Sequence, residues 1–151
     1  MIEAMILNVI MDPIRGDPVM APFPDNGMLH TPSPHPFAET LRRLEAAIVK
    51  RSIPILATID HADGAAKAGL FMNPATVVIF GNAKAGTPIM QAAPTAALDL
   101  PLKTLIWQDA AGQVWISINT PEYLQTRHAI PDNLVPNIAG ITTIVAEAVS
   151  S

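Results

Sequence analysis

The stretch "LKTLIWQDAAGQVWISIN" constrains the fold more than any other part of the sequence, because it predicts two strands joined by a tight turn. Residues 102–108 and 113–119 are rich in β-branched and apolar side chains. The connection between them ends in Gly112, which can take a positive φ. We expect an antiparallel hairpin in which Trp107 and Trp115 stack across the two strands. Such a hairpin excludes a purely parallel, doubly wound sheet.

Three further segments predict strands. Residues 28–32 form a short extended piece. The segment "IPILATID" (residues 53–60) alternates apolar side chains, and Pro54 near its start favours either an edge strand or the beginning of a strand. The segment "TVVIFG" (residues 76–81) is apolar on both faces, which predicts an inner strand buried from both sides. Together with the hairpin, these segments predict a sheet of about five strands.

The first helix is predicted by four apolar residues that recur at the spacing of one helix face: Phe37, Leu41, Leu44 and Ile48. We expect Ser33 to cap this helix and Pro34 and Pro36 to lie in its first turn, where backbone N–H groups lack helical partners. The basic residues 50–51 close the helix, which suits the negative end of its dipole.

Local signals predict three more helices. An alanine-rich segment at 61–69 ends in a glycine and predicts a short helix. Thr120 and Pro121 are residue types typical of an N-cap and a first helical position, so we expect a helix from there to about His128. Residues 134–149 repeat an apolar face and predict the last helix.

The order of these elements predicts an α+β fold, with a mainly antiparallel sheet and helices packed on one face. The chain has 151 residues, of which 50% are hydrophobic, which is enough for one domain with a real core. We expect that domain at residues 28–151. Residues 1–27 are interpreted as a proline-rich extension, irregular from Asp12 to Asn26. It is either a loosely ordered tail or an arm that pairs with a sheet edge or a second subunit.

The composition excludes several classes of function. The chain has 13 acidic and 9 basic side chains, so we expect no cationic surface that binds nucleic acid. The apolar run at residues 5–11 is far shorter than a membrane helix, and no basic signal-peptide start precedes it. The sequence contains no cysteine, which excludes disulfides and thiolate catalysis. We therefore expect a cytoplasmic protein that does not bind membranes.

The segment "FGNAKAGTPIM" (residues 80–90) has the look of a phosphate-binding loop between a strand and a helix. A nucleotide-binding P-loop needs a lysine and a hydroxyl residue directly after its last glycine, whereas here Thr87 and Pro88 follow Gly86. The motif therefore does not predict nucleotide hydrolysis.

A weaker anion site is still compatible with this segment, because backbone N–H groups at a helix start attract negative charge. Its candidate contacts are Asn82, Lys84, Gly86 and Thr87. In the structural alternative, Thr87 is the N-cap, Pro88 starts the helix, and the glycines only permit the turn.

A second candidate is the segment "IDHAD", in which Asp60 and His61 follow a strand. A carboxylate beside a histidine can orient the imidazole for general acid or base catalysis. Alternatively, Asp60 or His61 only caps the following helix. A metal would need a third ligand such as His128, which nothing in the sequence brings close, so we expect no metal site and no cofactor.

Several segments and their spacing also carry a resemblance to a known family: "ETLRRLEAAI", "ATIDHADGAAKAGL", "IFGNAKAGTPIMQAAPTAALDLPLK" and "IWQDAAGQVWISINTPEYLQTRH". From about Thr31 to Ile130 the chain resembles the Domain of Unknown Function 302 family, and "FGNAKAGTPIMQ" is the most specific piece. The resemblance implies a small α+β domain, often a homodimer, with no established reaction and no catalytic residues to carry over. The chain departs from the family in its N-terminal extension and in Pro34 and Pro36.

Three functional hypotheses follow. In the first, the domain binds a small anionic or polar ligand without catalysing a reaction, through Asn82, Lys84, Gly86 and Thr87 with His61 nearby. In the second, it is an enzyme that uses His61 as general acid or base and Asp60 to orient it. In the third, it is an interaction protein whose apolar sheet face or N-terminal arm forms a homodimer.

Overall fold

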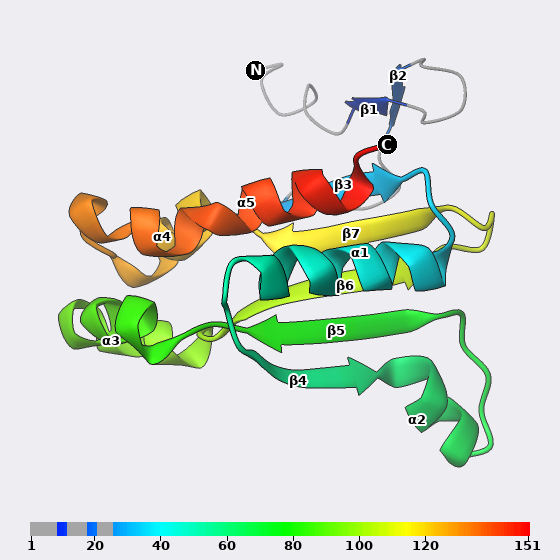
Figure 1. The fold of residues 1–151 in the computed structure, drawn as a ribbon, viewed down its shortest axis with the longest axis horizontal. Coiled ribbons are helices and arrows are strands. Elements are labelled where there is room, and N and C mark those ends of the chain that lie inside the picture. The colour runs from blue at the N-terminus through cyan, green and yellow to red at the C-terminus, as the bar shows by residue number, and fades with distance from the viewer. Residues whose placement is uncertain (1–8, 12–17, 21–25) are drawn as a thin grey trace.

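The main sheet contains five strands, and the computed structural model describes residues 9–11, 18–20 and 26–151 of the chain. The strands are β3 (Met28–Ser33), β4 (Ile55–Asp60), β5 (Ala75–Phe80), β6 (Leu102–Gln108) and β7 (Val114–Asn119). Across the sheet they run in the order β3, β7, β6, β5, β4, and every neighbouring pair is antiparallel (Figure 1). The predicted hairpin (β6 and β7) and the predicted edge strand (β4) are both confirmed.

A separate pair of short strands precedes this sheet. Strand β1 (Val9–Met11) pairs antiparallel with β2 (Pro18–Met20). The prediction that residues 12–26 are irregular is therefore wrong at 18–20, and residues 12–17 and 21–25 lie outside the described part. Pro18 stands at the beginning of its strand, a position that tolerates the missing N–H of proline.

The helices divide between one face of the sheet and its ends. Over the described residues they are α1 (Phe37–Lys50), α2 (His61–Lys67), α3 (Ala83–Ala92), α4 (Pro121–His128) and α5 (Pro136–Val149), with the short 3-10 helices η2 (Pro94–Leu98) and η3 (Asp132–Leu134). Helices α1 and α5 lie side by side on one face of the sheet (Figure 1). Helices α3 and α4 gather at one end, and α2 lies at the opposite end. The predicted α+β fold is confirmed.

The main core lies between this helix pair and the sheet face that it covers. Leu44 of α1, Ile144 of α5, and Phe80, Ile106 and Ile116 of the sheet are almost completely buried in one cluster. Burial of apolar area on this scale is the dominant favourable term in folding. A second cluster closes the end of the sheet, where buried side chains of α3, α4 and α5 meet.

Burial along β5 shows that only one of its faces is fully covered. Val78 and Phe80 are buried, whereas Val77 and Ile79 on the other face are only half-buried. The prediction that this strand is buried from both sides is therefore wrong. The reason is that α1 and α5 both pack on the same face, so an apolar side chain on the second face keeps part of its surface exposed.

Helix α1 begins later than predicted. Its N-cap is Pro36, which has no capping side chain, while Ser33 is the last residue of β3. The Oγ of Ser33 lies 2.7 Å from the Oγ1 of Thr40 and accepts the N–H of His35. His35 precedes a proline, which disfavours helical backbone at that residue, so the helix starts only after Pro36.

The hairpin and the helix after it agree closely with the sequence predictions. Trp107 and Trp115 stack with ring centroids 6.3 Å apart, and Gly112 takes a φ of +87° in the turn. Thr120 caps α4 by accepting the N–H of Tyr123 on its side-chain oxygen. The stacking, the turn and the cap are thus confirmed.

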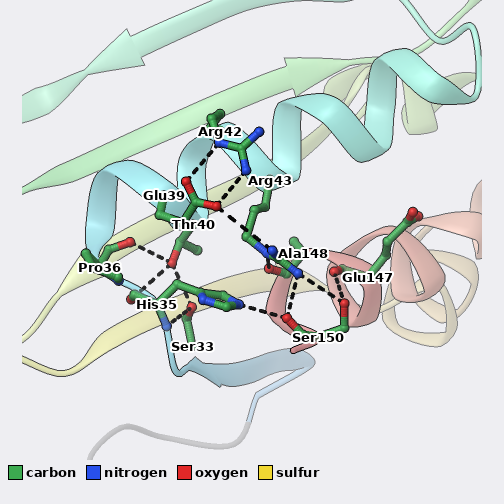
Figure 2. A network of polar contacts seen from close by, with 10 residues as sticks. All are labelled: Ser33, His35, Pro36, Glu39, Thr40, Arg42, Arg43, Glu147, Ala148 and Ser150. Atoms are coloured by element: carbon green, nitrogen blue, oxygen red, sulfur yellow. Dashed lines mark hydrogen bonds and ion pairs between the residues drawn. The ribbon is translucent and has the colours of Figure 1, made fainter.

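Basic side chains of α1 hold the end of α5, as Figure 2 shows. The Arg43 guanidinium donates to the Ala148 carbonyl at 3.0 Å and to the Ser150 carbonyl at 2.6 Å. The ring of His35 lies 2.8 Å from the same Ser150 oxygen. The last carbonyls of a helix lack intrahelical partners, so these contacts satisfy acceptors that would otherwise need water.

Glu147 links the same two helices through an ion-pair cluster. Its carboxylate accepts from the ammonium of Lys50 at 2.8 Å and from the guanidinium of Arg51 at 2.5 Å. The hydrogen bond from Lys50, followed by that from Arg51, lowers the pKa of Glu147 below its usual value of 4.5. A carboxyl group whose pKa is lower in the folded state stabilises the fold only while it is ionised.

We therefore expect the contribution of Glu147 to be complete above pH ~5 and to be lost as the pH falls through its lowered folded-state pKa. Urea unfolding between pH 7 and pH 3 measures this loss. In Glu147→Gln the acid-induced fall in the free energy of unfolding should be shallower than in the wild type. Equal slopes in the two proteins would mean that the ion pairs contribute nothing in solution.

Candidate functional site

Helix α3, which follows β5, begins earlier than predicted from the sequence. Asn82 has an extended backbone, and its Oδ1 accepts the N–H of Ala85 at 2.7 Å. Asn82 is therefore the N-cap, and the helix begins at Ala83. The prediction that Thr87 caps the helix and Pro88 starts it is wrong. Asn82, two residues after the end of β5, already supplies a capping side chain.

Pro88 consequently lies inside α3, where a proline normally interrupts the ladder of hydrogen bonds. Its missing N–H would have bonded to the carbonyl of Lys84. Lys84 belongs to the exposed first turn, where that carbonyl can bond to water instead. Gly86, assigned to a turn from the sequence, is likewise a helical residue.

A cavity of about 500 Å³ opens beside this junction. Its walls come from four parts of the chain: Pro54 and Leu56 at β4; Gly81, Asn82, Ala83, Ala85, Gly86 and Met90 at α3; Leu100, Pro101 and Leu102 before and in β6; and Asn137 and Ile138 at the start of α5. The lining is almost entirely apolar, and its polar side chains, Asn82 and Asn137, are uncharged. The Nδ2 of Asn137 donates to the Ala85 carbonyl at 3.0 Å and so ties α5 to α3.

The predicted contact residues of α3 divide between the cavity and the solvent. Asn82 and Gly86 line the cavity. Lys84 and Thr87 are exposed and are not among its lining residues. The first-turn N–H groups of Ala83 and Lys84 have no intrahelical partner, as at any helix start. Ala83 brings this positive helix end to the cavity wall.

Asp60 and His61 lie far from the cavity. Strand β4 runs antiparallel to β5, with Ile55 opposite Phe80 at one end and Asp60 opposite Thr76 at the other. Because a strand rises about 3.3 Å per residue, roughly 15 Å separates the two ends. The two groups of candidate residues therefore do not form one pocket.

At its own end of the sheet, Asp60 has a structural role. Its Oδ1 accepts the N–H of Asp63 at 2.9 Å and caps α2. His61 is exposed, and within the described part of the chain its ring forms no hydrogen bond. The helix-cap interpretation of Asp60 is confirmed. No group of three or more metal-ligating side chains occurs among the described residues.

Most of the residues that line the cavity were not predicted from the sequence. Leu100 and Pro101 belong to the connection after η2, and Asn137 lies more than thirty residues further along. No local pattern links these segments, because packing of α3 against α5 brings them together. One available signal was Asn137 itself, a polar residue in the first turn of a helix whose next polar side chain is Thr142.

These features define a class: a small α+β domain with a five-stranded antiparallel sheet, two helices on one face, and an apolar cavity at the β5–α3 junction. The chain belongs to the family described as Domain of unknown function DUF302, whose model matches residues 29–148. A crystal structure of an uncharacterized conserved DUF302 protein from Bacillus stearothermophilus has the same fold, with a TM-score of 0.68 at 18% identity. The match covers 83% of this chain and 97% of that one.

Curated relatives in Brucella carry the name of an ion channel. The chain is 39% identical over 113 residues to fluoride-specific ion channel FluC 1 of Brucella suis, which is 75% of this chain and 44% of the relative. The fluoride-specific ion channel FluC 2 of Brucella melitensis matches equally well, over 42% of its length. The chain thus spans less than half of these relatives. Among its described residues no helix is long and apolar enough to cross a membrane.

Proposed function

We propose that this domain binds a small organic anion whose apolar body fills the cavity and whose charged group meets the start of α3. The observation that carries this proposal is the cavity of about 500 Å³ with the N-terminus of a helix in its wall. Ligand sites are commonly apolar hollows of this size with a few convergent polar groups. The orphan N–H groups of the helix start supply the polar end.

The lining favours binding over catalysis, because none of the described residues that form it has a titratable side chain that could move a proton. The apolar lining also favours an anion that has an apolar part over an anion that is polar throughout. Lys84 lies outside the lining and is exposed, so it acts on the ligand only through solvent. Across the intervening water, the attraction between the Lys84 ammonium and the ligand contributes about 0.5 kcal/mol to the binding free energy. Salt screens this contribution further.

A chain-length series of carboxylates tests the proposal by isothermal titration calorimetry. We expect hexanoate to bind at least about tenfold more tightly than acetate, because each buried CH₂ contributes roughly 0.8 kcal/mol. Hexanol should bind more weakly than hexanoate, because it cannot use the helix start as an anion does. Lys84→Ala should weaken hexanoate binding by about twofold at low salt. Unchanged binding would remove Lys84 from the site.

Gly86→Leu should block the cavity and weaken hexanoate binding about tenfold or more. A Cβ at Gly86 meets only ordinary contacts, 3.7 Å from Met90 and 3.9 Å from Leu100, so the longer side chain extends into the hollow without forcing the backbone apart. The matched control is Gly140→Leu, at a helical glycine of α5 that has no described atom within 4 Å of its Cβ position. Equal affinities in both variants would place the ligand elsewhere.

Fluoride is the second anion to test, and the names of the Brucella relatives favour it. Those names describe proteins more than twice as long as the aligned segment, so ion transport is not assigned to this chain. In this alternative the domain senses fluoride next to a channel. Fluoride binding in the absence of hexanoate binding would replace the organic anion with an inorganic one.

A homodimer is the second candidate function, and the edge strand β4 favours it. Most of its residues are exposed, and Leu56 and Ile59 leave 57% and 43% of their surface uncovered. An edge strand offers unpaired backbone groups to another strand, and a two-fold axis would let β4 pair with its own copy. The N-terminal arm is the other contact considered above, and most of it lies outside the described residues.

Sedimentation equilibrium should show a dimer for the wild type and a monomer for Ile59→Lys, because an edge lysine opposes strand pairing. Val49→Lys is the matched control, since Val49 is 62% exposed on α1. We expect it to remain dimeric. If deletion of residues 1–27 dissociates the dimer and Ile59→Lys does not, the arm makes the contact. A monomeric wild type would rule out both.

A further inference from the structure

A relay of three polar side chains, none of which lines the cavity, lies between η2 and the end of α4. The ring of His128 lies between the hydroxyl of Thr95 and the carboxylate of Asp99. Its Nε2 is 2.5 Å from Asp99 Oδ2, and its Nδ1 is 2.9 Å from Thr95 Oγ1. Only 3% of the histidine side chain and 16% of the aspartate side chain are exposed, whereas Thr95 is exposed.

The positions of the hydrogens follow from the partners. An ionised carboxylate only accepts hydrogen bonds, so Nε2 of His128 carries the hydrogen that points to Asp99. In the neutral imidazole, Nδ1 then bears the lone pair, and it faces the Thr95 hydroxyl. A carboxylate, an imidazole and a hydroxyl in this order form the arrangement that activates hydroxyl nucleophiles, which is recognised by geometry rather than by fold.

The backbone fixes this relay from both sides. Thr95 and Asp99 are four residues apart, in and directly after η2, and His128 is the last residue of α4. Buried Leu124 and Ala96 join the two elements in one apolar cluster. Fixed elements hold a catalytic geometry better than mobile loops do, and the buried ring cannot exchange its partners for water.

Two charged side chains of the described residues contact Asp99, and the ammonium of Lys103 does so only through the Asp99 carbonyl, at 3.5 Å. The guanidinium of Arg127 lies 3.2 Å from Asp99 Oδ2 and is 44% exposed. In a purely structural role, Asp99 would only join η2 to α4 through His128 and Arg127. In that role the Thr95 hydroxyl would only satisfy the buried Nδ1 of the ring. The two roles differ in reactivity, because only a general base at Nδ1 makes the exposed Thr95 hydroxyl more nucleophilic than other exposed threonines.

We propose that Thr95 is a nucleophile that accepts acyl groups from small activated esters. Its Oγ1 attacks the ester carbonyl, and its proton passes to His128 Nδ1 while Asp99 stabilises the imidazolium. The bond between the acyl carbon and the leaving oxygen breaks, and the leaving group takes up the proton from His128. The products are an ester on Thr95 and a free alcohol or phenol.

p-Nitrophenyl acetate is the probe for this site, with intact mass spectrometry and peptide mapping as the readout on the full chain. We expect acetylation of Thr95 to be about a hundredfold faster than that of Thr142, an exposed threonine whose hydroxyl only donates to the Ala139 carbonyl. Thr95→Val should remove the adduct. Because Thr95 is exposed, this change leaves the core intact.

Two further variants separate activation from structure. Asp99→Asn retains the shape but no longer favours the required tautomer of His128, so Thr95 acetylation should fall at least about tenfold. Glu122→Gln changes an exposed carboxylate on the same helix that has no described hydrogen bond or ion pair with Thr95, Asp99 or His128, and it should acetylate as the wild type does. Equal acetylation of Thr95 and Thr142, or full acetylation in a folded Asp99→Asn protein, would overturn the proposal. Circular dichroism confirms that each variant is folded.

Discussion

Gly27→Ala is expected to destabilise the domain by about 3 kcal/mol. Gly27 has a φ of +90°, a region that costs a residue with a Cβ roughly 1 kcal/mol or more. A Cβ there would also lie 2.2 Å from the Cδ2 of Tyr123, so the ring or the backbone must move. Overpacking of this kind adds roughly 1–3 kcal/mol. The carbonyl of Gly27 accepts the N–H of Thr120, so the movement would reach the start of α4.

Gly69→Ala separates the two contributions. Gly69 also has a positive φ, +77°, but no atom of the described part of the chain lies within 4 Å of its Cβ position. This variant should therefore lose only the backbone part, about 1 kcal/mol. Urea unfolding at pH 7 measures both variants. If the two lose the same free energy, the side chain of Tyr123 moves aside at little cost and the steric argument fails.

Phe80→Ala is expected to have the largest effect of any single substitution considered, about 3–5 kcal/mol. Phe80 is 1% exposed and belongs to the core between the sheet and α1. Removing its ring loses the transfer free energy and leaves a cavity that rigid strands on both sides cannot close. Because Phe80 is two residues before the N-cap of α3, the hexanoate affinity of the variant should fall as well.

Phe71→Ala provides the comparison at the same residue type. Phe71 is 89% exposed between α2 and β5, so its loss should change the free energy of unfolding by less than about 0.5 kcal/mol. Thermal or urea unfolding of both variants at low protein concentration gives the two values. A loss below 1 kcal/mol for Phe80→Ala would mean that the core around it collapses to fill the space.

The parts of the fold that the sequence predicted well are those with local causes. The hairpin depends on two alternating runs and a glycine at positive φ, all within 18 residues. Helix α4 depends on Thr120 and Pro121, which act within one turn. These signals need no knowledge of distant partners, so their elements were predicted almost residue by residue.

The errors lie at helix starts, where the sequence does not show which of several suitable residues acts as the N-cap. Ser33 and Thr87 are both good capping residues, yet Ser33 ends a strand and Thr87 lies inside a helix. The Pro36 that follows His35 and the asparagine two residues after the end of β5, Asn82, set where the two helices begin. The cavity and the Thr95 relay were missed for a different reason: each joins segments that only tertiary packing brings together. His128 was noticed only as a possible metal ligand.

The length of β5 has a consequence for how this domain can vary. Its two ends, one at the cavity and one at the Asp60 cap, are separated by roughly 15 Å of rigid sheet. Substitutions that far apart and without shared partners usually have additive effects on stability. Substitutions can therefore reshape the cavity at one end while the exposed residues at the other end change, and neither set of changes depends on the other.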